Sequence, residues 1–170
     1  MLVEKKIGRL SDYPGYDVQY VDIEWFECHK KINKKTLPSG EEIGIRLSDH
    51  DARHGLDQDD VLAVIDKQVI AVNVSECDAL VINCPDDLIP KACYEIGNRH
   101  APFFHGEHKG EFYTPFDKPI MVMLEKLGVN VKTASVKLNK GRAISSSTGS
   151  HGHDHGGHDG NHDHSHSHAH

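Results

Sequence analysis

Residues 80–97 read Leu-Val-Ile-Asn-Cys-Pro-Asp-Asp-Leu-Ile-Pro-Lys-Ala-Cys-Tyr-Glu-Ile-Gly, and they set the architecture of the second half of the chain. The apolar run Leu80 to Ile82 is typical of a buried strand, and the Pro and Asp residues at 85–87 supply a helix start. Pro90 comes early enough in the helix to be tolerated. Apolar residues at helical spacing then form one stripe, which Gly97 ends: Leu88, Ile89, Ala92, Cys93 and Ile96.

The residues that follow complete a recognisable order of elements. Two short strands are predicted at Pro102–Phe104 and Glu111–Thr114. A second helix starts at its cap Asp117 and stops at Gly128, and a last strand runs from Val129 to Leu138. Residues 76–143 therefore predict a βαββαβ order, which is that of a ferredoxin-like domain.

Residues 1–75 show strand signals separated by turns. Asp17–Glu27 is rich in Val, Tyr, Trp and Phe, and Ile43–Leu47 alternates with period two. Val61–Ile65 and Val69–Val74 are β-branched runs that predict a hairpin. We expect a small all-β N-terminal domain, and hence an α+β fold class for the whole chain. The polar stretch 48–60, with His50 and His54, is predicted to be a solvated loop.

Residues 144–170 have a different composition. A Ser-rich linker is followed, from residue 151, by a tail made of His, Gly, Asp, Ser, Asn and Ala, which has no apolar surface to bury. We expect this His-rich tail to be disordered. Nine of the 15 histidines of the chain lie in it: His151, His153, His155, His158, His162, His164, His166, His168 and His170.

The formal charge of −7 belongs to two parts, because three Asp lie in the tail and the rest of the chain carries −4. The shortage of basic and aromatic residues argues against nucleic-acid binding, and no apolar run is long enough for a membrane span. The first residues lack the apolar segment and cleavage site of an export signal. We therefore expect a cytoplasmic protein with four free cysteines.

The tail composition favours metal binding over a purification tag or meaningless low complexity, since Asp and Gly interrupt the histidines. Neutral imidazole suits Ni(II), Zn(II) and Cu(II). Three further histidines follow the first predicted helix, namely His100, His105 and His108. His100 lies just past the helix end, where carbonyl groups favour a cation. One imidazole is too few for a metal ion, and a symmetric dimer would supply it twice.

The segment Tyr94-Glu-Ile-Gly-Asn-Arg-His100, together with the β-rich stretch Val21–Glu27 and with 115–119 and 124–129, resembles the UreE family of urease accessory proteins, which are nickel metallochaperones. The resemblance covers the whole predicted folded body. It implies a peptide-binding-like N-terminal domain and a homodimer whose two copies of His100 bind one Ni(II). It also implies delivery of nickel to apo-urease together with a GTPase accessory protein. His105 and His108 are candidates for a secondary metal site, although their spacing differs from the His-x-His pair of family members.

Three functions are therefore compared. The first is a nickel metallochaperone, and the second is a general nickel, zinc or copper storage protein without a delivery partner. The third is an enzyme, which we do not expect, because the chain has no His-Glu-x-x-His motif, phosphate loop or nucleophile elbow. Zn(II) and Cu(II) are expected to bind in vitro, because imidazole generally binds Cu(II) at least as tightly as Ni(II).

Overall fold

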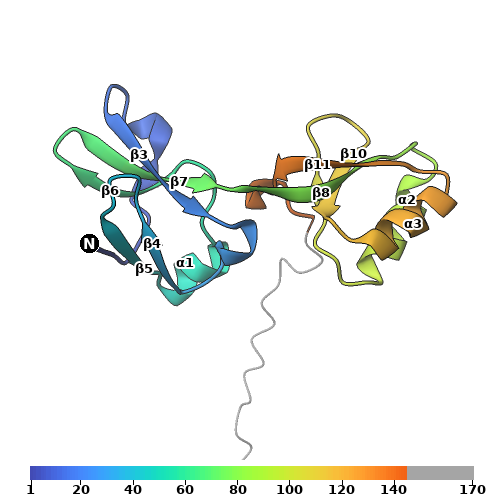
Figure 1. Cartoon of the computed structure of the whole chain (residues 1–170), viewed down its shortest axis with the longest axis horizontal. Helices are drawn as coiled ribbons and strands as arrows, with labels where there is room; N and C mark the ends of the chain where they lie inside the picture. Colours follow the sequence, from blue (N-terminus) through green and yellow to red (C-terminus); the bar gives the residue numbers. More distant parts are fainter. Residues whose placement is uncertain (145–170) are drawn as a thin grey trace, which may run out of the picture.

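The computed structural model describes residues 1–144, in which eleven strands, three α-helices and three short 3₁₀ segments form a mixed α+β fold. N-terminal sheets come first and a βαββαβ region follows, as Figure 1 shows from left to right. The predicted fold class is therefore confirmed for this part of the chain. The Ser linker from residue 145 and the nine tail histidines lie outside the described residues. The division into separate domains at residues 75 and 76 stays a prediction.

The βαββαβ region has the predicted order of elements. Its strands and helices are β8 (Glu76–Asn83), α2 (Ile89–Gly97), β9 (Phe104–His105), β10 (Glu111–Pro115), α3 (Lys118–Lys126) and β11 (Asn130–Lys137). The sheet order is β11-β8-β10-β9, and every neighbouring pair is antiparallel. In order of appearance this is 4-1-3-2, the arrangement of a ferredoxin-like sheet. The short Phe104–His105 strand is displaced by two residues from its predicted start.

Strand β8 is apolar on both faces because each face is covered. Leu80 and Ile82 pack under α2 and α3, together with Ile96 and Leu124. Ala79 and Val81 point to the opposite face of the sheet. This two-sided burial explains why the sequence has a continuous apolar run there rather than an alternating one.

Helix α3 begins and ends where its sequence predicts. Asp117 Oδ1 accepts a hydrogen bond of 2.8 Å from the backbone N–H of Ile120, which makes Asp117 the N-cap. Gly128 has a φ of +82°, a left-handed conformation that glycine adopts without steric cost. These two residues fix the length of the helix over the sheet.

The N-terminal region contains two sheets. One has the order β1-β5-β4, formed by Leu2–Val3, Glu42–Arg46 and Ile32–Thr36. The other has the order β2-β6-β7-β3, formed by Gly8–Arg9, Asp60–Ile65, Gln68–Val74 and Asp17–Ile23. The predicted β6–β7 hairpin is confirmed, whereas the parallel pairing of β3 with β7 has no counterpart in the predictions. Three 3₁₀ segments lie at Leu10–Asp12, Trp25–Glu27 and Lys140–Arg142.

A six-residue helix, α1 (Asp49–His54), replaces the first part of the predicted loop. The expectation that His50 and His54 lie in an irregular loop is therefore wrong. The side-chain oxygen of Ser48 accepts a 3.0 Å hydrogen bond from the N–H of Asp51, and Ala52 is buried. These contacts hold a helix that is too short to be stable by itself.

The hairpin is fixed to the rest of its sheet through Asp60, which is 1% exposed. Its carboxylate accepts hydrogen bonds from Lys6 Nζ at 3.2 Å, Arg9 Nη1 at 3.0 Å and the Asp57 N–H at 2.9 Å. A buried carboxylate needs such partners, since an unpaired charge away from water is strongly unfavourable. Asp60 thus links the first strands of the chain to β6.

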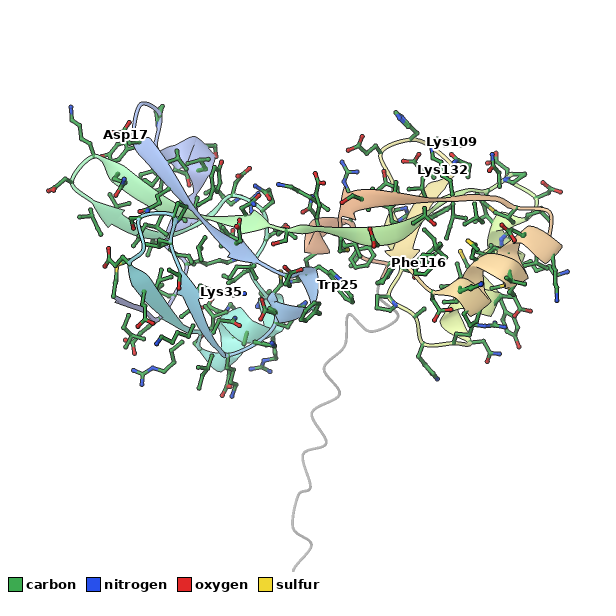
Figure 2. All side chains as sticks on the ribbon, viewed as in Figure 1. Asp17, Trp25, Lys35, Lys109, Phe116 and Lys132 are labelled. Atoms are coloured by element: carbon green, nitrogen blue, oxygen red, sulfur yellow. The ribbon has the colours of Figure 1, made fainter. Side chains whose placement is uncertain are left out.

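The two regions contact each other on the sheet face opposite α2 and α3. Trp25, labelled in Figure 2, packs edge-on against Phe104, with ring centroids 6.1 Å apart. Lys137 Nζ on β11 donates to the side-chain oxygen of Asn73 on β7 at 2.6 Å. Trp25 thus packs against the apolar cluster on the second face of the βαββαβ sheet, and the helical side of that region faces away (Figure 1).

Candidate metal centre

His100 follows helix α2, and the local sequence determines its conformation. Ala92 and Ile96 are buried under the helix, so the remaining side of α2 faces outward. Helix α2 ends at Gly97, as its sequence predicts, but Gly97 is not the left-handed residue of the turn that follows. Asn98 is still right-handed, and the left-handed residue is His100, with a φ of +53°.

Two backbone hydrogen bonds define this turn. The His100 N–H donates to the Gly97 oxygen at 2.9 Å, and the Ala101 N–H donates to the Ile96 oxygen at 3.4 Å. This pair of bonds is that of a Schellman motif, with His100 in the position that glycine usually occupies. Ala101 and Ile96 also belong to the same apolar core cluster, which is the hydrophobic contact expected of the motif. A histidine in this position is less common than a glycine.

The His100 side chain is exposed, and within residues 1–144 its ring takes part in no hydrogen bond. Its neighbour Arg99 turns back along the helix, where Nη1 donates to Glu95 Oε2 at 3.0 Å and to the Glu95 backbone oxygen at 2.9 Å. The guanidinium charge is therefore paired with a carboxylate. This arrangement reduces the repulsion that a cation at His100 would meet.

An open groove of about 350 Å³ lies beside this turn. It is lined by Arg99, Ala101 and Pro102 from the turn, and by Phe116, Pro119 and other residues before and within α3. Phe116, labelled in Figure 2, is 46% exposed, and Tyr94 on α2 is 70% exposed. Aromatic side chains exposed to this degree around one turn are typical of a surface that a partner covers.

The other two predicted histidines of this region lie on and after β9. His105 pairs with Phe112 across the β9–β10 ladder, and the two ring centroids are 5.8 Å apart. His108 lies in the following turn, where its backbone oxygen accepts a 3.1 Å hydrogen bond from the Glu111 N–H. In residues 1–144 no three His, Cys, Asp or Glu side chains gather in a metal-binding group. The structure therefore does not bring His100, His105 and His108 together into one site.

The carboxylate of Glu111 accepts hydrogen bonds at the turn that carries His108. The Tyr113 hydroxyl donates to Glu111 Oε1 at 2.7 Å, and this bond holds the pKa of Glu111 below its ordinary value of 4.5. The Glu107 N–H donates to the same oxygen at 2.9 Å. Glu111 is thus occupied in shaping the turn that carries His108.

The close approach of two histidines was not predicted from the sequence. His50 and His54 lie on α1 with ring centroids 4.2 Å apart. The signal was present in the four-residue spacing after Ser48, a residue type that often caps helices.

Comparison with known proteins identifies the family. The UreE urease accessory protein N-terminal domain family matches residues 3–75, and the family of its C-terminal domain matches residues 58–170. The chain belongs to the UreE family of urease accessory proteins. The resemblance carried by the segment ending at His100 is therefore confirmed.

Individual UreE proteins are similar along most of their length. Urease accessory protein UreE of Helicobacter pylori is 42% identical over 150 residues, which cover 86% of this chain and 88% of that protein. The protein of the same name from Helicobacter acinonychis is 41% identical over the same shares. That of Acetivibrio thermocellus is 38% identical over 160 residues, or 90% of this chain and all of its own length.

One further expectation concerns membranes. No helix within residues 1–144 of this UreE family member is long and apolar enough to cross one. The longest helices in that part of the chain, α2 and α3, have nine residues each, whereas a span needs about 20.

Proposed function

We propose that this UreE protein is a nickel-binding metallochaperone that captures Ni(II) and delivers it to apo-urease while the urease active site matures. The observation that carries the proposal is the conformation of His100. It is an exposed imidazole held in a left-handed turn at a helix end, in a chain of the urease accessory family.

Two physical features support a cation at this point. The carbonyl groups at the end of α2 carry partial negative charge, and the nearest cation, Arg99, is already paired with Glu95. One imidazole fills only one of the four to six positions around Ni(II). A homodimer with His100 near its two-fold axis supplies a second imidazole, and exposed Tyr94 and Phe116 supply apolar surface for such a contact.

The remaining positions are proposed to be filled by the tail and by water. The tail ligands are His151, His153, His155, His158, His162, His164, His166, His168 and His170. His105 and His108 are secondary candidates, each acting separately. An exposed, partly open coordination sphere exchanges ligands readily, which suits a carrier that must release its metal.

The proposal includes partners and a location. The chain acts in the cytoplasm as a carrier and not as a catalyst. It hands nickel to a complex of apo-urease with a GTPase accessory protein. The partners are an expectation from the family, and transfer to apo-urease tests them directly. The location is an expectation from the first residues of the sequence, which lack the apolar segment of an export signal.

The test is a nickel titration of three forms, with the mass in solution measured throughout: the full chain, a form ending at Thr148, and the full chain with His100→Ala. We expect the truncated form to retain one Ni(II) per dimer at His100 and His100→Ala to lose that ion. His29→Ala is the control, since it removes an exposed imidazole to which the proposal assigns no metal. Loss of all binding on truncation, with no effect of His100→Ala, would instead establish the storage function.

Delivery needs its own measurement. Nickel-loaded chain is mixed with apo-urease, the GTPase partner and GTP, in the presence of a chelator that removes free Ni(II). Urease activity should appear with the full chain and should fall to the level of free nickel with His100→Ala. Equal activation by both forms would contradict a carrier role for His100.

A further inference from the structure

Helix α1 brings two imidazole rings together on the exposed side of the N-terminal region. His50 and His54 are four residues apart, so they lie on the same side of the helix. Their ring centroids are 4.2 Å apart and the ring planes are inclined by 37°. Both residues are exposed, and the His50 side chain is 76% accessible.

In both rings an acceptor lies beside Nδ1, which leaves Nε2 available to a metal. Nδ1 of His54 lies 2.8 Å from the backbone oxygen of His50, which can only accept, so Nδ1 carries the proton. Nδ1 of His50 lies 3.6 Å from Oδ1 of Asp51, a carboxylate that attracts the same proton. An imidazole protonated on Nδ1 presents an unprotonated Nε2. Metal-bound histidines commonly donate their second ring nitrogen in this way.

Contacts at both ends fix the separation of the rings before any metal arrives. At the start of the helix, the Ser48 side-chain oxygen accepts a hydrogen bond from the Asp51 N–H. At the end of the helix, the Gly55 N–H donates to the backbone oxygen of Asp51 at 2.7 Å. His29 Nδ1 lies 3.1 Å from the oxygen of Ala52, whose side chain is buried. Donors held at a fixed separation bind a metal better than donors that must first be brought together.

The charges around the pair also favour a cation. Lys31 forms an ion pair with Asp49, and Arg53 Nε donates to the Asp49 backbone oxygen at 3.2 Å. Both nearby positive groups thus have an acceptor of their own. Asp51 adds a negative charge next to His50.

We propose that Nε2 of His50 and Nε2 of His54 form a two-imidazole chelate for Ni²⁺, Cu²⁺ or Zn²⁺, with water completing the coordination. We call this pair the α1 site. Two histidines at this spacing on one helix face bind zinc in unrelated metalloproteins. The α1 site lies in the N-terminal region, whereas His100 follows α2 in the other region (Figure 1). It therefore does not depend on the proposed role of His100.

The test uses the full chain and reads each histidine separately. Free Ni²⁺ is set by a nitrilotriacetate buffer, so that nickel on the tail does not change its concentration. Reaction of each imidazole with diethyl pyrocarbonate is followed by mass spectrometry. His50 and His54 should become protected over the same range of free nickel, and His50→Gln should move the midpoint for His54 upward on the order of 100-fold. His54→Gln should do the same to His50.

His29 is the internal control, because its ring has a backbone acceptor but no second imidazole beside it. The free nickel concentration at which His29 is half protected should be the same in the unaltered chain and in each variant. An unchanged midpoint of His54 in His50→Gln, or protection of the two rings at different nickel concentrations, overturns the chelate. His100→Ala should leave the α1 site midpoint unchanged, so failure of one proposal is distinguishable from failure of the other.

A second measurement needs no substitution. With Zn²⁺ as a diamagnetic probe, the Nε2 resonances of His50 and His54 should shift together and by more than the Nδ1 resonances of the same rings. A larger shift at Nδ1 than at Nε2 in either ring, or a shift at only one ring, overturns the proposed ligand set.

Discussion

Replacing His100 with glycine should stabilise the fold while removing the proposed nickel ligand. The φ of His100 is +53°, a conformation that crowds the Cβ of an L residue against the following carbonyl and costs roughly 1–2 kcal/mol. Glycine has no such contact, but its freedom in the unfolded chain takes back about 0.5–1 kcal/mol. We therefore expect His100→Gly to raise the free energy of unfolding by about 0.5–1 kcal/mol.

Two controls isolate the backbone effect. His100→Ala also lacks the imidazole but keeps a Cβ, so it should be less stable than His100→Gly by about 1 kcal/mol. Asn98 lies two residues earlier in the same turn, with a right-handed φ of −64°. Asn98→Gly only adds freedom there and should lower the free energy of unfolding by about 0.3 kcal/mol.

The assay is urea denaturation followed by far-ultraviolet circular dichroism, at one protein concentration and with a chelator present to remove metal. The change should lie in the midpoint and not in the slope, since the surface exposed on unfolding is the same. If His100→Gly is no more stable than His100→Ala, the left-handed turn does not exist in solution. The reasoning that places the His100 ring outside the helix end would then be refuted.

Three further predictions follow from the same structure. Tyr113→Phe should raise the pKa of Glu111 toward 4.5, as measured by carboxyl NMR titration, because it removes the hydrogen bond that lowers it. The stability that Glu111 contributes, through its lowered pKa, should be present above pH 4.5 and lost as pH falls through the folded-state pKa, and Tyr113→Phe should reduce that loss. Asp60→Ala should lower the free energy of unfolding by about 1–3 kcal/mol, because it removes the acceptor of the hydrogen bonds from Lys6, Arg9 and the Asp57 N–H. Asp86→Ala, at an exposed ion pair, should change it by less than about 0.5 kcal/mol. Nickel affinity should fall as pH drops through about 6.5, where protons compete for imidazole nitrogen, and equal nickel capacity at pH 5 and pH 8 in equilibrium dialysis would rule out imidazole ligation.

The βαββαβ region was predictable because its signals are local and agree with one another. The apolar run of β8, the cap Asp117 and the stop Gly128 each act within a few residues. Helix α2 ends at Gly97 as predicted, but the position of the left-handed residue after it was not predictable in the same way. The turn continues to His100, so that Ala101 can pack on Ile96. That choice depends on a core contact, which no local pattern contains.

The N-terminal region was harder to predict for two physical reasons. Helix α1 has six residues, fewer than two turns, so its apolar positions cannot show a helical period. The parallel pairing of β3 with β7 joins segments about fifty residues apart, and nothing in either segment specifies the direction of its neighbour. The hairpin of β6 and β7 was predictable because its turn at Asp66 and Lys67 connects adjacent strands.

Burial of the cysteines determines which ligands this UreE protein offers to a metal. All four cysteines are free thiols, and two of them, Cys28 and Cys84, are buried. Burial raises the pKa of the Cys28 thiol to about 11, and it also raises those of Cys77, Cys84 and Cys93. The thiolate is the form that binds metal, so at neutral pH these sulfur atoms compete weakly with imidazole. His50, His54 and His100 are instead exposed, and borderline imidazole ligands open to water hold Ni(II) less firmly than a thiolate cage. The proposed nickel carrier would therefore gain from having its soft ligands in the core and its histidines at helix ends.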